Sequence, residues 1–499
     1  MSVPRQPASG AAGPPRAAGP VVGFDLDMTL LDPRRGVVAT YAALAAETGV
    51  TIDGEAAAAR LGPPLEEEIA RWFPPERVAE TAASYRELYA VHALPVSLPM
   101  PGAADAVAQV RRHGGQVVVV TAKSEPLARA SLTHIGIEVD AVEGWRFAET
   151  KAEAMIEHDV TIYAGDHVGD IVGAHAAGAL AVAVATGPCS ADELAAAGAD
   201  VVLPDLAAFG GWLSSHLLPG RLDDLAARLA GLGSVLVAFS GGADSAFLLT
   251  AAVRTLGADR VVAATASSAS LPAAELAAAT DFAARLGVRH LTPATNEMGR
   301  EGYRANGPDR CYFCKAELTE TLRPLADSLG LVHVVTGTNA DDAVAGFRPG
   351  IRAAAQRGAR TPLLDAGLTK AQVREASRRW GLSTWDKPAA ACLASRIAYG
   401  IEVSPARLAR VERAEAGLRV ALAAAGLAVR NLRVRDLDGL AMVEVDADQV
   451  AALAARPDLL AALEGFDRVE VDPRGFRSGS MNELLPAVAR ASGEGGAGR

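Results

Sequence analysis

Two stretches of the chain alternate short, fully apolar segments with segments of helical periodicity. In the first stretch the apolar segments include Val21 to Phe24, Gln116 to Val120 and Leu180 to Ala185, and a second series begins at Val235 to Phe239. Short apolar runs are typical of strands buried on both faces, and alternation with helices favours a parallel sheet that helices cover on both sides. The sequence therefore predicts an α/β protein with two parallel-sheet domains.

The predicted domain boundaries follow changes in this pattern. We expect a disordered tail at 1–20, a Rossmann-like domain at 21–217 with a helical cap at about 33–101, a second Rossmann-like domain at 221–405, a small α+β domain at 406–487 and a second tail at 488–499. The segment from Gly210 to Pro219 is the expected boundary between the two larger domains. Within the small domain we expect a helix from Ala447 to Leu463.

Charge and hydropathy exclude several classes of protein. The 499 residues carry a formal net charge of -11, so no overall basic surface indicates nucleic acid, and a tRNA substrate is disfavoured. No run reaches the roughly 18 apolar residues of a membrane helix. The Pro- and Gly-rich N-terminus lacks the apolar core of a signal peptide. We expect a cytoplasmic protein with no membrane partner, and a homo-oligomer is compatible with the sequence.

Lysine is scarce in this chain and therefore informative. Only five of the 48 basic residues are lysines: Lys123, Lys151, Lys315, Lys370 and Lys387. Arginine can replace lysine at most surface positions, but a compact ammonium in a tight site cannot be exchanged for a planar guanidinium. The lysines that remain are expected to be enriched at functional positions.

Polar residues gather at the predicted strand ends of the first domain. They are Asp25 and Asp27 after the first strand, Thr121 after the second, and then Lys151, Asp166 and Asp170. One carboxylate can attack a phosphoryl group while its neighbour donates and accepts the proton as a general acid/base. A hydroxyl and an ammonium can bind the phosphoryl oxygens, and the late acidic pair can hold Mg²⁺ together with Asp25.

In order and spacing these four clusters resemble the haloacid dehalogenase-like phosphohydrolases, over Val21 to about Leu217. The resemblance implies Asp25 as the nucleophile that forms an aspartyl-phosphate and Asp27 as the general acid/base. It implies Thr121 and Lys151 as groups that stabilise the phosphate, and Asp166 with Asp170 as metal-site carboxylates. For Asp170 a cap of the following helix is the alternative.

A glycine loop opens the second domain. Ser240, Gly241, Gly242, Asp244 and Ser245 lie in SGGADS, between a predicted buried strand and a helix. Glycines let backbone N–H groups approach an anion, and the helix N-terminus adds partial positive charge. The chain has no Gly-Lys pair, so this is not a Walker loop. SGGADS instead resembles the PP-loop ATP pyrophosphatases, which implies ATP, adenylation of a substrate, and Asp244 as a ligand of Mg²⁺ on the pyrophosphate.

Three of the four cysteines gather in two motifs of the second domain. Cys311 and Cys314 form RCYFCK, and Cys392 lies in WDKPAAACLASR, with no His near either segment. Three thiolates can hold a metal centre and leave one position open for chemistry. A zinc site completed by a carboxylate is one alternative. A sacrificial Cys392 beside an idle CxxC pair is the other.

Eight motifs resemble, in the same order, those of the LarE family of ATP-dependent sulfur transferases, over Arg221 to about Leu485. They are SGGADS, RCYFCK, GTNADD, FRPG, GLTK, WDKP, CLASR and FRSGSMN. The resemblance implies adenylation and thiolation of pyridinium-3,5-biscarboxylic acid mononucleotide, a nucleotide substrate in nickel-pincer cofactor synthesis. Some members of the family give up the sulfur of a single cysteine, at the position of Cys392, and others bind a [4Fe-4S] cluster through three cysteines, with sulfide on the free iron. This sequence has the three-cysteine pattern, so the resemblance implies the cluster on Cys311, Cys314 and Cys392, with sulfide or another sulfur donor. Substrate contacts are expected from Arg348, Ser395, Arg396, Arg477 and Ser478. For Arg477 a surface salt bridge is the alternative. Asp341 and Asp342 are expected to face the active site, with a helix cap as the alternative for one of them.

The sequence thus predicts a bifunctional enzyme, a capped phosphohydrolase joined to an adenylating sulfur transferase. The rivals are a tRNA thiolase, an ammonia-dependent amide synthase, and a transferase whose phosphatase half is only a binding module. One hypothesis for the fusion is that the phosphatase hydrolyses pyrophosphate or AMP and so draws the adenylation forward. The alternative is that it acts on an unrelated or damaged nucleotide.

Overall fold

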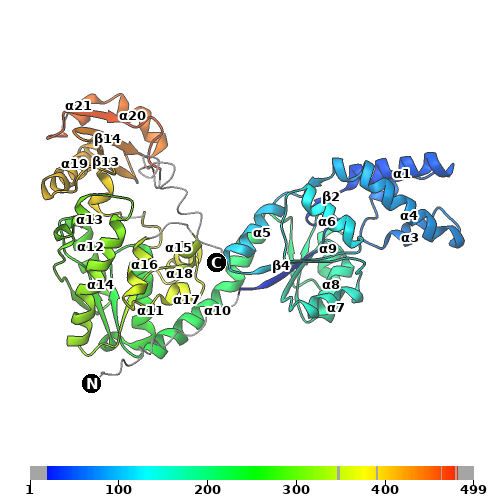
Figure 1. The fold of residues 1–499 in the computed structure, drawn as a ribbon, viewed down its shortest axis with the longest axis horizontal. Helices are drawn as coiled ribbons and strands as arrows, with labels where there is room; N and C mark the ends of the chain where they lie inside the picture. The colour runs from blue at the N-terminus through cyan, green and yellow to red at the C-terminus, as the bar shows by residue number, and fades with distance from the viewer. Residues whose placement is uncertain (1–18, 345–348, 389–390, 462, 478–479, 481–499) are drawn as a thin grey trace, which may run out of the picture. The chain divides into compact units, whose positions relative to one another are not determined.

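The computed structural model describes residues 19–344, 349–388, 391–461, 463–477 and 480 (Figure 1). The described chain divides after Leu217 into two compact units. Within these residues no helix is long and apolar enough to cross a membrane.

The first unit is built on a six-stranded parallel sheet. Its strand order is β5 (Ala141–Glu143), β4 (Gln116–Val120), β1 (Val21–Phe24), β6 (Ile162–Gly165), β7 (Leu180–Val184) and β8 (Val201–Leu203). Its helices are α5 (Ala103–Arg112), α6 (Glu125–His134), α7 (Glu149–Glu157), α8 (Val168–Ala176) and α9 (Ala191–Ala196). Because side chains alternate along a strand, Val117 and Val119 pack with α5 and α6, while Val118 and Val120 pack with α7 and α8.

Four helices between β1 and β4 form a cap with its own core. They are α1 (Arg34–Thr48), α2 (Gly54–Ala58), α3 (Leu65–Ile69) and α4 (Pro75–His92). A short helix η1 (Leu94–Val96) and the antiparallel pair β2 (Leu31–Asp32) and β3 (Leu98–Pro99) lie at the base of the cap. Its core includes Tyr41, Leu44 and Tyr85, and the Tyr41 and Tyr85 ring centroids are 4.7 Å apart.

The segment expected as a boundary is helical. Helix α10 (Phe209–Leu232) runs through Gly210 to Pro219 without interruption and contains Pro219 in its interior. The two glycines and the proline disfavour a helix. Packing overrides them, because Phe209 and Leu213 join the core of the first unit, and Leu225 and Leu229 join a core of the second.

The second unit contains a four-stranded parallel sheet in the order β11 (Arg289–Leu291), β10 (Val261–Ala264), β9 (Val235–Ala238) and β12 (His333–Thr336). Helices α11 (Ala243–Leu256), α12 (Ala273–Arg285) and α18 (Lys370–Arg379) pack on one face, and α14 (Arg310–Ser328) packs on the other. The shorter helices are η2 (Ala258–Arg260), η3 (Glu297–Gly299), α13 (Glu301–Arg304), α15 (Ala340–Val344), α16 (Pro349–Gln356), α17 (Pro362–Asp365) and η4 (Leu393–Arg396).

The C-terminal part of this unit is a small α+β layer. Strands β13 (Leu432–Asp436) and β14 (Leu440–Val445) are antiparallel, and β15 (Arg468–Val471) joins β14 in parallel. Helix α19 (Pro405–Ala424) packs on them. The two parallel sheets, the helical cap and this small layer confirm the predicted fold class.

The single helix predicted from Ala447 to Leu463 is wrong. The structure has η5 (Ala447–Gln449), α20 (Val450–Ala454) and α21 (Pro457–Leu460) in its place. Proline at 457 disfavours helical backbone at the residue before it, and Arg456 accordingly leaves the helical region with φ -123° and ψ 67°.

Candidate active sites

Three buried carboxylates meet at the carboxyl ends of β1 and β6. Asp25 follows β1, Asp166 follows β6, and Asp170 lies in the first turn of α8; oxygens of the three lie within 4.8 Å of one another. The ammonium of Lys151 from α7 lies 3.0 Å from Asp25 Oδ1 and 2.5 Å from Asp170 Oδ1. Four residues predicted from the sequence therefore form one charged cluster.

The cluster carries more negative charge than its lysine can balance. Burial raises the pKa of Asp25 to about 6, with repulsion from Asp170 opposing the attraction of Lys151. Burial and the charges of Asp25 and Asp170 raise the pKa of Asp166 well above its usual value. Burial works to lower the pKa of Lys151, but Asp170 and Asp25 hold it well above the ordinary range. Buried carboxylate oxygens with excess negative charge fit Mg²⁺.

Asp166 and Asp170 are both fixed in position. Thr29 Oγ1 donates to Asp166 Oδ1 at 2.8 Å, and a Cβ at Gly187 would lie 1.8 Å from Asp166 Oδ2, so only glycine fits there. Asp170 Oδ2 accepts the backbone N–H of His167 at 3.0 Å in a capping box, while its Oδ1 faces Lys151. Asp170 is thus a helix cap and a member of the cluster at once.

Lys123 is a candidate functional residue that belongs to none of the motifs found in the sequence. Its Nζ donates to Asp27 Oδ1 at 2.8 Å and to the Tyr89 hydroxyl of the cap at 2.6 Å. Thr121, also at the end of β4, is buried, and its Oγ1 accepts the backbone N–H of Lys123 at 3.3 Å. The scarcity of lysine was the one sequence signal that pointed to this residue.

A cavity of about 100 Å³ lies between the cap and these strand ends. Asp25, Asp27, Thr121 and Lys123 line it from the sheet. The cap contributes a group of polar side chains, Tyr41, Arg60, Glu68, Tyr85, Arg86 and Tyr89.

The glycine loop of the second unit connects β9 to α11. Gly242 is the N-cap of α11 and no side chain caps this end, so the first N–H groups have no acceptor within the helix. Ser245 Oγ lies 3.1 Å from Ser240 Oγ and donates to the Gly242 carbonyl at 3.1 Å, which closes the loop. Gly241 has φ 71° and lies against Ala279, where a Cβ would come within 3.2 Å. This backbone fits a pyrophosphate.

Charged residues surround the loop. Burial raises the pKa of Asp244 to about 6, and the nearby Asp342 adds to this rise. Lys370 Nζ lies 3.1 Å from Asp342 Oδ1, whereas Asp341 accepts the backbone N–H of Lys370 at the start of α18. Lys387 Nζ donates to the Gly241 carbonyl at 3.0 Å and pairs with Glu275 at 2.7 Å. Lys387, which lines the same cavity as the loop, thereby holds the loop in place.

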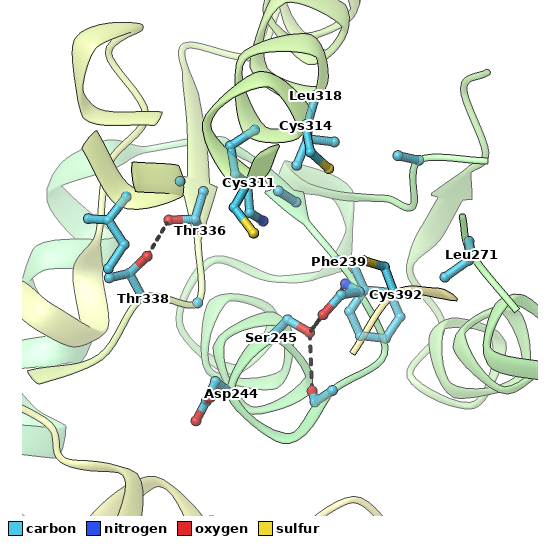
Figure 2. Close-up of a pocket in the computed structure, with 18 of the residues that line it drawn as sticks. Phe239, Asp244, Ser245, Leu271, Cys311, Cys314, Leu318, Thr336, Thr338 and Cys392 are labelled. Carbon is cyan, nitrogen blue, oxygen red and sulfur yellow. Dashed lines mark hydrogen bonds between the residues drawn. The ribbon is translucent and has the colours of Figure 1, made fainter. Parts of the chain in front are cut away.

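The three cysteines line the same cavity as this loop, a space of about 870 Å³. Figure 2 shows Cys311 and Cys314 on α14 and Cys392 on a separate segment, with Asp244 and Ser245 below them at the start of α11. The three sulfur atoms are not all within 4.8 Å of one another.

Burial favours the protonated form of the Cys311 and Cys314 thiols. It raises the pKa of Cys314 to about 12 and also raises the pKa of Cys311. Cys314 and Cys392 pack against a core that includes Tyr303, Leu393 and Ile397. A metal centre bound at Cys311 and Cys314 would therefore displace protons from both thiols.

Comparison with known proteins assigns both units. Residues 22–184 match the model of the haloacid dehalogenase-like hydrolases. A pyridinium-3,5-bisthiocarboxylic acid mononucleotide synthase from Lactiplantibacillus plantarum is 32% identical over 272 residues, which are 54% of this chain and 96% of that protein. The chain belongs to this synthase family, the LarE family, through its C-terminal part. It is an enzyme that joins a hydrolase to a sulfur transferase.

Two further relatives agree with this division. The uncharacterised protein slr1717 from Synechocystis is 40% identical over 274 residues, 54% of this chain and 99% of that protein. A 5'-nucleotidase from Pseudomonas aeruginosa is 29% identical over 216 residues, 40% of this chain and 96% of that protein. Both predicted family resemblances are confirmed. We refer below to the hydrolase unit and the LarE unit.

The loop and the cysteines of the LarE unit line the cavity of about 870 Å³, whereas the described residues that were predicted as substrate contacts do not. Arg348 and Ser478 lie outside the described residues. Ser395 and Arg396 are not in the cavity lining: Ser395 Oγ donates to the Cys392 carbonyl at 2.7 Å, and Arg396 makes a bidentate pair with Glu415 at 2.9 and 3.0 Å. Arg477 lies 3.7 Å from Asp472. Their assignment as substrate contacts stays a prediction.

Proposed function

We propose that the LarE unit uses ATP to adenylate a carboxylate of pyridinium-3,5-biscarboxylic acid mononucleotide and then replaces a carboxylate oxygen with sulfur. The observation that supports this most is that the glycine loop and the three cysteines line one cavity of about 870 Å³. That volume falls within the roughly 300–1,000 Å³ of typical ligand sites. The printed name of the L. plantarum relative is that of a synthase of the bisthiocarboxylic acid product.

In this proposal the loop residues hold and orient ATP. Backbone N–H groups at the start of α11 bind the pyrophosphate, and Asp244 holds the Mg²⁺ that accompanies it. The carboxylate attacks the α-phosphorus, the bond to pyrophosphate breaks, and an acyl-adenylate forms. A sulfur nucleophile then attacks the acyl carbon, and AMP leaves with one former carboxylate oxygen. The products are thiocarboxylate, AMP and pyrophosphate.

Cys311, Cys314 and Cys392 are the residues that would hold a [4Fe-4S] cluster in this site. Such a cluster would supply an open iron position for the sulfur to be transferred. The chain's own contribution is to place the sulfurs in the cavity that also receives ATP, with Cys392 as the N-cap of η4.

Gly241→Ala is expected to weaken ATP binding by the LarE unit about tenfold. An alanine at φ 71° costs roughly 1–2 kcal/mol, and its Cβ would press on Ala279. The measurement is isothermal titration of the full chain with a non-hydrolysable ATP analogue and Mg²⁺. Gly231→Ala is the matched control, because Gly231 lies in α10 with nothing within 4 Å of an added Cβ. Equal affinities of both variants would argue against the loop as the ATP site.

We propose that the hydrolase unit is a Mg²⁺-dependent phosphomonoesterase. Asp25 attacks the phosphoryl group, and the leaving oxygen takes a proton from Asp27; water then releases phosphate from Asp25. Thr121 and Lys151 hold the phosphoryl oxygens. Asp25, Asp166 and Asp170 would hold Mg²⁺, which would neutralise phosphoryl charge when bound. Lys123 keeps Asp27 in place through the 2.8 Å contact.

Mg²⁺ binding by the hydrolase unit is expected to tighten as the pH rises from about 5 to 7. The pKa of Asp25 without metal is about 6 and that of Asp166 is also raised, so below pH 6 protons compete with the metal. Calorimetry in two buffers of different ionisation enthalpy should detect proton release on binding. Asp166→Asn should lose the binding. An affinity that is independent of pH would contradict the assignment.

A further inference from the structure

Three hydroxyl groups in the cap-side cavity of the hydrolase unit have no hydrogen-bond partner among the described residues. They belong to Tyr41, Tyr85 and Ser124, which line the cavity and are 2%, 6% and 7% exposed. Burial raises the pKa of both tyrosines well above the usual value, so both are neutral hydroxyls at physiological pH. The three hydroxyl oxygens themselves stay open to the cavity, so a ligand that supplies hydrogen bonds can take the place of water on them.

The cationic side chains that line this cavity already form ion pairs with carboxylates. Arg60 makes two hydrogen bonds to Glu68, at 3.0 and 2.6 Å. Arg86 pairs with Glu66 at 2.5 Å and lies over the Trp145 ring. Lys123 pairs with Asp27 at 2.8 Å. A negatively charged leaving group would have to compete with these carboxylates for the cations. An uncharged polar group could instead hydrogen-bond to the three hydroxyls.

The size of the cavity adds a second restriction. Its volume of about 100 Å³ is well below the roughly 300–1,000 Å³ of sites for larger ligands. The aromatic faces of Tyr41 and Tyr85, 4.7 Å apart, form part of its wall. The space beyond the catalytic aspartates suits a leaving group of a few carbon atoms.

We infer that the hydrolase unit acts on phosphate monoesters of small, uncharged polyols, with Tyr41, Tyr85 and Ser124 as the residues that select the leaving group. The inference rests on the proposed phosphomonoesterase function. The bond from phosphorus to the polyol oxygen breaks, that oxygen takes the proton from Asp27, and water supplies the oxygen of the released phosphate. Tyrosine hydroxyls bind the remaining hydroxyls of the polyol.

This specificity disagrees with the hypothesis that the fusion serves to remove AMP or pyrophosphate. A nucleoside is too large for the cavity, and pyrophosphate brings a second anion to a site whose lining cations are paired. Phosphoglycolate is the informative comparison, because its leaving group is small but carries a carboxylate.

The test measures phosphate release by the full chain with Mg²⁺ from glycerol 3-phosphate, phosphoglycolate, AMP, pyrophosphate and methyl phosphate. We expect kcat/KM for glycerol 3-phosphate to exceed the values for phosphoglycolate, AMP and pyrophosphate at least tenfold. Higher turnover of any of those three would overturn the inference and leave the phosphomonoesterase function standing. No release from any ester would overturn both.

Tyr41→Phe and Tyr85→Phe test the selecting residues while keeping the contact between the two tilted rings. Each is expected to raise KM for glycerol 3-phosphate about fivefold, which is the loss of one hydrogen bond, and to have a smaller effect on kcat/KM for methyl phosphate, whose leaving group has no second hydroxyl. Tyr312→Phe is the control, because this hydroxyl donates to Gln356 in the LarE unit and should change neither value. Equal effects on both substrates would show a structural role and contradict the inference.

Discussion

Asp25→Asn is expected to reduce phosphate release by the hydrolase unit at least about a thousandfold and to leave sulfur transfer unchanged. A carboxamide has nearly the same shape as the carboxylate but is a far weaker nucleophile. The two units have separate cores, divided after Leu217, so the loss should stay within the hydrolase unit. Both activities are measured on the same preparation, phosphate release with glycerol 3-phosphate and sulfur transfer by product mass.

Asp32→Asn provides the matched control for this prediction. Asp32 is a carboxylate of the same unit that pairs with Arg34 at 2.7 Å and does not line the cavity. It should retain phosphate release. If Asp25→Asn were folded and lacked both activities, the two reactions would depend on a shared site, and the separation into two independent enzymes would be wrong.

Replacing Cys311, Cys314 or Cys392 with serine is expected to abolish iron binding and sulfur transfer by the LarE unit. A serine hydroxyl is a poor ligand for iron–sulfur clusters, and the cavity offers no other cysteine in the described residues. ATP binding should persist, because the glycine loop closes through Ser240, Ser245 and Lys387. Iron and sulfide analysis of anaerobically purified protein provides the measurement.

Cys189→Ser is the control for the cysteine series. Cys189 lies in the hydrolase unit, packed against the core that includes Ile171 and Leu194. Its replacement should leave iron content unchanged. Anaerobically reconstituted protein with one zinc per chain and no iron would contradict the cluster. Sulfur transfer that persists in the Cys311 and Cys314 variants would contradict the role of the cluster in the reaction.

The sequence was sufficient to predict those site residues whose positions are set by the end of a strand or the start of a helix. Asp25, Asp166 and Asp170 follow parallel strands or begin the next helix, and parallel strands deliver their carboxyl ends to one edge of a sheet. The same reasoning placed the glycine loop between β9 and α11. In both cases a short local pattern fixes the position of the side chain.

Side chains that reach a site from a distant element could not be predicted in this way. Tyr41 and Tyr85 come from two cap helices, and nothing in their spacing shows that they line the cavity near Asp27. Arg396 lies beside Cys392 in the sequence, yet its guanidinium is held by Glu415 of α19. Tertiary partners, which the local pattern does not contain, decide such orientations.

In the proposed reaction the LarE unit replaces a carboxylate oxygen with sulfur. The most direct measurement is mass spectrometry of pyridinium-3,5-biscarboxylic acid mononucleotide after anaerobic incubation with the reconstituted protein, ATP, Mg²⁺ and sulfide. We expect a product with one oxygen exchanged for sulfur, together with one AMP for each exchange. An unchanged dicarboxylate, with AMP formed only when ammonia or tRNA is supplied, would contradict it.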